Sequence, residues 1–101
     1  MKKKAVEIAK KLKEKLKKYA DFEGLYLYGS QVTGKTNKYS DIDICAVFKE
    51  NKDYSREVLH DAYQIELDND IILDFHPMTL EQLNENWFYF NEIKKGIYYA
   101  R

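Results

Sequence analysis

The segment Asp41–Phe48 constrains the fold more than any other part of the sequence, because it combines an apolar strand with two acidic residues. It reads Asp-Ile-Asp-Ile-Cys-Ala-Val-Phe, so that Asp41 and Asp43 alternate with isoleucines. Successive side chains of a strand point to opposite faces of a sheet, which puts both carboxylates on one face, about 6.6 Å apart along the strand. Two carboxylates so placed can bind one hard cation between them and a second one beside it. The segment therefore predicts a core strand that begins in a metal-binding acidic pair.

A glycine-containing segment precedes this strand and matches the phosphate-loop pattern. Residues 29–36 read Gly-Ser-Gln-Val-Thr-Gly-Lys-Thr and follow a predicted strand over residues 22–29. A phosphate loop must open a long helix whose N-terminus holds the phosphates. Only residues 37–40 separate Thr36 from the next strand, whereas a parallel crossover needs about a dozen residues. The sequence therefore argues against a P-loop NTPase and favours a turn at Gly29 and Ser30 that leads toward the acidic strand.

A third acid lies inside the apolar run of residues 71–75, which reads Ile-Ile-Leu-Asp-Phe. Burying an uncompensated carboxylate is costly, so Asp74 needs a partner, a metal ion or a raised pKa. Beside Asp41 and Asp43, it would complete a three-carboxylate metal site. Asp70 has the same parity and is the alternative third acid, but it belongs to the turn-like Asp-Asn-Asp sequence at residues 68–70. We favour Asp74.

The rest of the chain predicts helices around a small sheet. Apolar residues between Ala5 and Tyr19 recur every three or four positions and predict an amphipathic helix. Thr79–Gln82 matches a capping box at the start of a short helix. The predicted strands lie at residues 22–29, 41–48, 71–76 and 97–99, and the other helices at 54–67 and 79–86. Pro77 is expected to end the third strand, and an aromatic cluster at residues 87–90 is expected to be partly exposed. We predict a single domain over residues 1–101.

Composition excludes several classes of protein. The 101 residues include 17 basic and 17 acidic residues, and this balance argues against a dedicated nucleic-acid binder. The sequence has no apolar run of about 20 residues, which a membrane span needs, and its basic first residues precede no signal-peptide core. The one cysteine fits a reducing compartment. We therefore expect a cytoplasmic domain with no membrane partner and no direct nucleic-acid partner.

Two further residues share the parity of the acids. Cys45 lies on the same face of its strand as Asp43, but Mg²⁺ prefers oxygen ligands and cysteine is often interior, so we expect a small buried hydrophobe. His76 has the parity of Asp74 and could donate a hydrogen bond beside the metal site.

The Gly29-Ser30 pair, the ten residues after it, the pair Asp41-x-Asp43 and the later Asp74 together resemble the nucleotidyltransferase superfamily of the DNA polymerase β type. The small size resembles the minimal nucleotidyltransferases (MNT), which are the antitoxin halves of prokaryotic HEPN–MNT toxin–antitoxin pairs. The resemblance implies an α+β fold, like the polymerase β palm, in which a small mixed β-sheet is backed by helices.

The same resemblance implies roles for the singled-out residues. Asp41, Asp43 and Asp74 would be the catalytic residues and would bind two Mg²⁺ ions, and Gly29 and Ser30 would hold the phosphates of ATP, the substrate. Family members often carry a basic residue where this chain has Thr33. Lys35 is the candidate to supply the phosphate-binding charge in its place, with Lys38 as the alternative.

From this resemblance we expect a Mg²⁺-dependent nucleotidyltransferase that moves a nucleoside monophosphate, AMP from ATP, to a hydroxyl of a partner protein. The expected partner is a HEPN-type toxin, for which the chain would be the antitoxin. A palm alone offers no acceptor site, so the acceptor would come with that partner or with a second copy of the chain in a homo-oligomer. The alternative is a non-catalytic antitoxin that neutralises its toxin by complex formation. The three acids favour the enzyme, because a covering protein does not need them.

Overall fold

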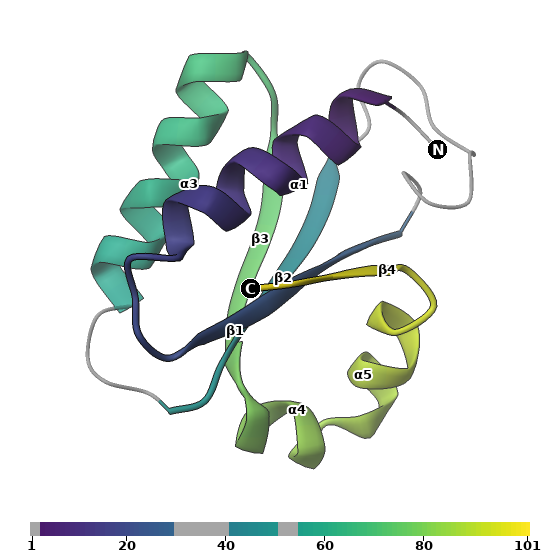
Figure 1. Ribbon diagram of the computed structural model, residues 1–101. Coiled ribbons are helices and arrows are strands. Elements are labelled where there is room, and N and C mark those ends of the chain that lie inside the picture. The colour runs from purple at the N-terminus through teal and green to yellow at the C-terminus, as the bar shows by residue number, and fades with distance from the viewer. Residues whose placement is uncertain (1–2, 30–40, 51–54) are drawn as a thin grey trace.

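The structure, a computed structural model, describes residues 3–29, 41–50 and 55–101 and contains a four-stranded sheet in the order β3-β2-β1-β4 (Figure 1). Strand β1 pairs antiparallel with both β2 and β4, whereas β2 and β3 are parallel. The sheet is therefore mixed, and the predicted α+β class is confirmed. Its elements are α1 (Lys3–Leu16), β1 (Phe22–Tyr28), β2 (Ile42–Phe48), α3 (Ser55–Asn69), β3 (Leu73–Thr79), α4 (Leu80–Glu85), α5 (Trp87–Ile93) and β4 (Ile97–Ala100).

The two faces of the sheet pack against different helices. On one face, α1 and α3 supply residues such as Leu12 and Val58 to a core that includes Ile44 of β2. On the other face, Leu83 of α4 and Ile93 of α5 pack against residues of β2 that include Cys45. Strand β2 contributes to both cores because its successive side chains point to opposite faces. By this alternation, Asp43 lies on the face that α4 and α5 cover.

The prediction that Pro77 ends the third strand is wrong. Strand β3 runs through Pro77 to Thr79, with Pro77 opposite Ala46 of β2. Proline lacks an N–H group and is tolerated in an edge strand, where that group has no neighbour to pair with. Because β3 is an edge strand, Pro77 does not interrupt it.

Helices α4 and α5 each begin at an N-cap residue, and the sequence predicts the first of the two. The predicted capping box is confirmed, since the Thr79 hydroxyl accepts a hydrogen bond from the Gln82 backbone N–H (3.1 Å) and the Gln82 side chain accepts one from the Thr79 N–H (2.9 Å). The aromatic cluster at residues 87–90 forms the first part of α5, whose N-cap is Asn86. None of the described helices is long and apolar enough to cross a membrane.

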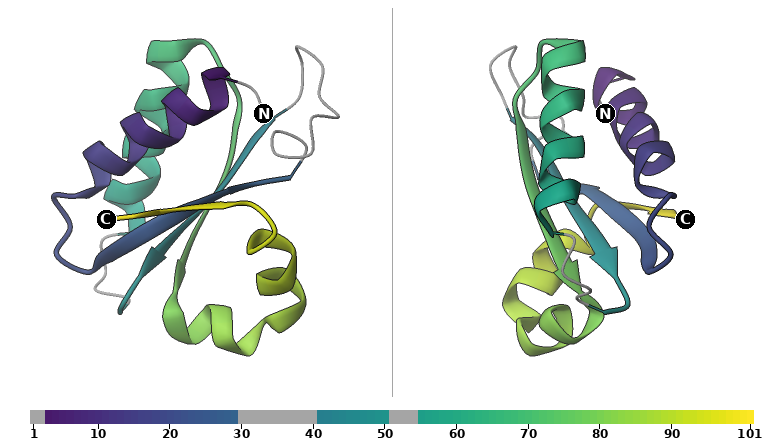
Figure 2. Two further views of the ribbon diagram at one scale, coloured as in Figure 1. Left: turned by 45° about the vertical axis from the view of Figure 1, so that its right-hand side comes forward. Right: turned by 90° about the vertical axis from the view of Figure 1, so that its left-hand side faces the viewer.

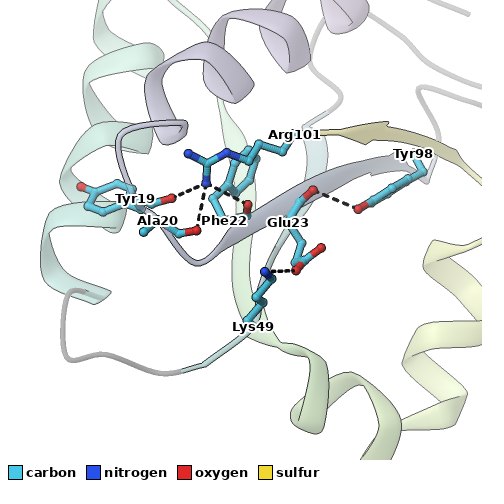
Figure 3. Close-up of polar contacts among 7 residues, drawn as sticks. All are labelled: Tyr19, Ala20, Phe22, Glu23, Lys49, Tyr98 and Arg101. Carbon is cyan, nitrogen blue, oxygen red and sulfur yellow. Dashed lines mark hydrogen bonds and ion pairs between the residues drawn. The ribbon is translucent and has the colours of Figure 1, made fainter.

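The side chain of Arg101 ties the last strand to the connection between α1 and β1. Its Nη1 donates hydrogen bonds to the backbone oxygens of Tyr19 (2.7 Å), Ala20 (3.1 Å) and Phe22 (3.2 Å), as Figure 3 shows. Its Nη2 donates to the backbone oxygen of Lys17 (2.7 Å). One guanidinium therefore binds four backbone carbonyl groups between the end of α1 and the start of β1.

Candidate active site

The parallel register of β2 and β3 brings two of the predicted acids together. Asp43 and Asp74 are direct partners across the two strands, and the Asp74 carboxyl group is one cause of the raised pKa of Asp43. Asp41 is exposed and immediately precedes β2, and its charge acts on Asp43. Asp70 lies in the turn after α3, with a positive φ of 51°, and is not part of the β2–β3 pairing. The geometry therefore groups Asp74, rather than Asp70, with the acidic pair.

The carboxyl group of Asp43 holds its proton more tightly than an ordinary aspartate does. Burial raises the pKa of Asp43 to about 6, together with a hydrogen bond that its protonated carboxyl group donates to Asp74 and the negative charges of Asp74 and Asp41, and His76 partly offsets this rise. Two carboxylates this close cannot both ionise without cost unless a cation neutralises them. A bound divalent cation would supply that neutralisation.

The donor chemistry of this pair fits Mg²⁺. In the part of the chain that the structure describes, no group of three His, Cys, Asp or Glu side chains could hold a metal ion by itself. Mg²⁺ is commonly bound through one or two carboxylates plus substrate phosphates and water. Asp43 and Asp74 supply the carboxylates in such an arrangement, so the nucleotide would complete the coordination.

Gly29 lies against the acidic pair. It follows Tyr28, the partner of Asp43 in β1. Its φ of 77° is a backbone conformation that residues other than glycine rarely adopt. A Cβ atom at this position would lie 2.2 Å from Oδ2 of Asp43. The absence of a side chain at Gly29 thus leaves the room that the Asp43 carboxylate occupies. Ser30 and Lys35, the other predicted phosphate-binding residues, lie outside the described residues and stay predictions.

A histidine and two tyrosines extend the polar site. Nε2 of His76 lies 2.9 Å from Oδ1 of Asp74, so His76 can donate the hydrogen bond expected from its parity. The His76 ring contacts the ring of Tyr89 edge-on at a centroid distance of 6.0 Å. The Tyr89 hydroxyl in turn lies 2.6 Å from that of Tyr28. Burial is the main cause that raises the pKa of Tyr28 to about 12 and the pKa of Tyr89 further, so both hydroxyls stay neutral at ordinary pH.

The environment of two residues tests the reasoning from the sequence. Cys45 is fully buried, as expected, and burial raises the pKa of its thiol to about 12. The Asp74 side chain is 49% exposed, so the argument that it must be buried was wrong, although it does have partners in Asp43 and His76. The tyrosines were missed. The signal for Tyr28 was its place directly before Gly29, where strand pairing puts it opposite Asp43.

The raised pKa of Asp43 predicts a pH-dependent stability of the metal-free protein. An aspartate in the unfolded chain titrates near pH 3.9, whereas Asp43 in the folded chain titrates near pH 6. Between these values the folded state binds more protons, so this group lowers the free energy of unfolding as the pH rises from about 4 to about 6. We expect Asp43→Asn to lack this contribution. Thermal melts in EDTA across this range measure it, and parallel curves for the two proteins would contradict the assignment.

The chain is similar to proteins described as nucleotidyltransferases. A family model described as "Polymerase beta, Nucleotidyltransferase" matches residues 10–98, a range that includes Gly29 and all three acids. A crystal structure of a "putative nucleotidyltransferase" from Sulfolobus solfataricus is 21% identical over 100% of this chain and 91% of its own, with a TM-score of 0.63. A second structure described as a "putative nucleotidyltransferase" is 29% identical over 98% of this chain and 95% of its own, with a TM-score of 0.48.

The Sulfolobus structure shows that the fold is shared. A search of the curated proteins found no match. The family model, however, covers most of the chain and spans every described residue of the acidic site. The chain therefore belongs to the polymerase β-type nucleotidyltransferase family.

Proposed function

We propose that this nucleotidyltransferase uses Mg²⁺ to move a nucleoside monophosphate, AMP from ATP, onto a hydroxyl of a partner protein. The observation that carries the proposal is the direct pairing of Asp43 with Asp74 across β2 and β3, where burial and the neighbouring Asp74 carboxyl group raise the pKa of Asp43 to about 6. A stable fold does not require two like charges side by side. An enzyme that neutralises them with a metal ion and a nucleotide does require them.

Each residue has a proposed part in the reaction. Asp41, Asp43 and Asp74 would hold Mg²⁺, which supplies charge neutralisation for the triphosphate and lowers the pKa of the attacking hydroxyl. Asp74 would serve the side of the hydroxyl, and His76 holds its carboxylate in place through the 2.9 Å contact. Gly29, Ser30 and Lys35 would hold the phosphates. The hydroxyl releases its proton to water, its oxygen bonds to the α-phosphorus as the bond to the bridging oxygen of the β-phosphate breaks, and pyrophosphate leaves.

A groove beside the acids would receive the acceptor segment. It has a volume of about 570 Å³, is open to solvent and is lined by His76, Pro77, Met78, Gln82, Glu85 and Asn86. His76 belongs both to this groove and to the acidic site. A chain segment in the groove would therefore lie beside the atoms that hold the nucleotide.

We further propose that the partner is a HEPN-type toxin and that the chain is its antitoxin. The exposed aromatic pair Trp87 and Phe88 supports this. Their rings stack at a centroid distance of 4.1 Å, and the residues are 57% and 72% exposed. They follow Asn86, which lines the groove, so a protein bound to the aromatic pair would place a segment beside the acids.

A labelling experiment tests the transfer. The purified protein is incubated with Mg²⁺ and the product of the adjacent gene, with ATP labelled either at the α- or at the γ-phosphate. We expect the partner to be labelled from the α-position only, and EDTA to prevent the labelling. Label from the γ-position would indicate a kinase, and an unlabelled partner in a stable complex would favour the non-catalytic antitoxin.

The variant Phe88→Asp tests the partner surface. Because Phe88 is 72% exposed, the substitution should leave the melting temperature and Mn²⁺ binding unchanged and weaken the complex at least about tenfold, as expected for a buried aromatic contact. Lys10→Asp, at an exposed residue of α1, is the control and should leave the affinity for the partner unchanged. Equal effects of the two variants would place the partner elsewhere.

A further inference from the structure

Helix α3 carries an exposed apolar stripe. Leu59, Tyr63 and Leu67 are spaced four residues apart, which places them on one side of the helix, and they are 50%, 54% and 57% exposed. The opposite side of α3 packs into the core through Val58 and Ile65. In the right-hand view of Figure 2, α3 faces the viewer and no described element lies in front of it. A contiguous apolar surface of this kind marks an interaction site more often than chance.

The charges beside the stripe make it complementary to itself. Arg56, in the first turn of α3, lies before Leu59, and Asp70, in the turn that directly follows α3, lies beyond Leu67. Both are exposed. Counted from Tyr63, Arg56 and Asp70 are seven residues away in opposite directions. His60 and Glu66 are likewise three residues away on either side. An antiparallel copy of the same helix, centred on Tyr63, would therefore place Arg56 opposite Asp70 and His60 opposite Glu66.

We propose that the α3 helices of two copies of this chain pack antiparallel about a two-fold axis at Tyr63. Leu59 of one copy then contacts Leu67 of the other, and an Arg56–Asp70 ion pair forms at each end of the interface. A parallel pair would instead place Arg56 against Arg56 and Asp70 against Asp70, which like-charge repulsion disfavours. A two-fold interface uses the same patch on both copies, and this stripe has the required symmetry. The proposal concerns a surface separate from the acids and does not depend on the transfer reaction.

Cysteine cross-linking tests both the interface and its direction. Tyr63→Cys should form a disulfide-linked dimer on mild oxidation, because the two residues face each other at the axis. Leu59→Cys alone should not, because positions 59 of the two copies would be about 12 Å apart along the helices at 1.5 Å per residue, beyond the reach of a disulfide. A mixture of Leu59→Cys and Leu67→Cys should cross-link. Cys45 is fully buried and adds no background.

The oligomeric state provides the second measurement. Light scattering of the unmodified chain should give twice 12.1 kDa, falling to one copy on dilution. Tyr63→Glu, which places two carboxylates at the axis, should be a monomer with an unchanged circular dichroism spectrum. Phe88→Cys and Phe88→Glu are the controls, and they should neither cross-link nor dissociate the dimer. A monomer at every concentration, cross-linking of Leu59→Cys alone, or cross-linking through Phe88→Cys would each overturn the proposal.

Discussion

Replacing both Asp41 and Asp43 with Asn is expected to abolish nucleotide transfer while the fold persists. Metal ions that bridge a transferring phosphoryl group contribute several kcal/mol of charge stabilisation, so the loss should reach about 10³-fold or more. The free energy of unfolding should stay the same or rise slightly. Neutral amides remove the repulsion that, together with burial and a hydrogen bond, raises the pKa of Asp43 to about 6.

Label transfer and thermal melts measure the two effects. Asp70→Asn is the matched control, since Asp70 lies outside the β2–β3 pairing, and it should keep full activity. In cells, the double variant should no longer neutralise the proposed toxin partner, even if it still binds it. A folded double variant that protects cells as well as the unmodified protein would contradict the enzymatic proposal and favour the non-catalytic antitoxin.

Replacing Gly29 with Ala should reduce transfer about as severely as replacing Asp43. The new Cβ would lie 2.2 Å from Oδ2 of Asp43, so the carboxylate must move out of its position beside Asp74. The φ of 77° adds about 1 kcal/mol of backbone strain for a residue other than glycine. Positioning errors near 1 Å can cost about 10²-fold in rate. We therefore expect a loss of at least this size with a modest drop in melting temperature.

A double-mutant cycle identifies the cause of that loss. If Gly29→Ala acts through Asp43, then adding it to Asp43→Asn should reduce transfer little further, since residues that act through one another are not additive. Mn²⁺ binding to the single Gly29→Ala variant should also weaken. Independent, additive losses would show that Gly29 acts on the phosphates alone.

The acidic strand could be predicted from the sequence because its information is local. Alternation of Asp41 and Asp43 with isoleucines fixes which face of β2 each side chain occupies. The parity of Asp74 on β3 then fixes its face in the same way. The parallel register that pairs Asp43 with Asp74 is not fixed by parity, because a shift of two residues keeps the same faces. The roles of Ser30 and Lys35 were assigned by resemblance and stay predictions.

Features that depend on distant parts of the chain could not be predicted. Pro77 continues β3 only because β3 is an edge strand, which depends on the order of the whole sheet. The contact between the hydroxyls of Tyr28 and Tyr89 joins residues 61 positions apart and depends on how α5 packs on the sheet. The exposure of Asp74 follows from its place on that same edge strand. The apolar residues around it in the sequence suggest a buried strand instead.

The hydrogen bonds of Arg101 couple the stability of β4 to that of the C-terminal end of α1. The guanidinium holds carbonyl groups at the end of α1 and in the turn after it, and its own backbone N–H donates to Glu23 of β1 (2.9 Å). Detachment of β4 would therefore expose carbonyls at the end of the first helix to water. Segments opened by the same fluctuation share one opening free energy. The last turn of α1 and strand β4 therefore form one cooperative unit.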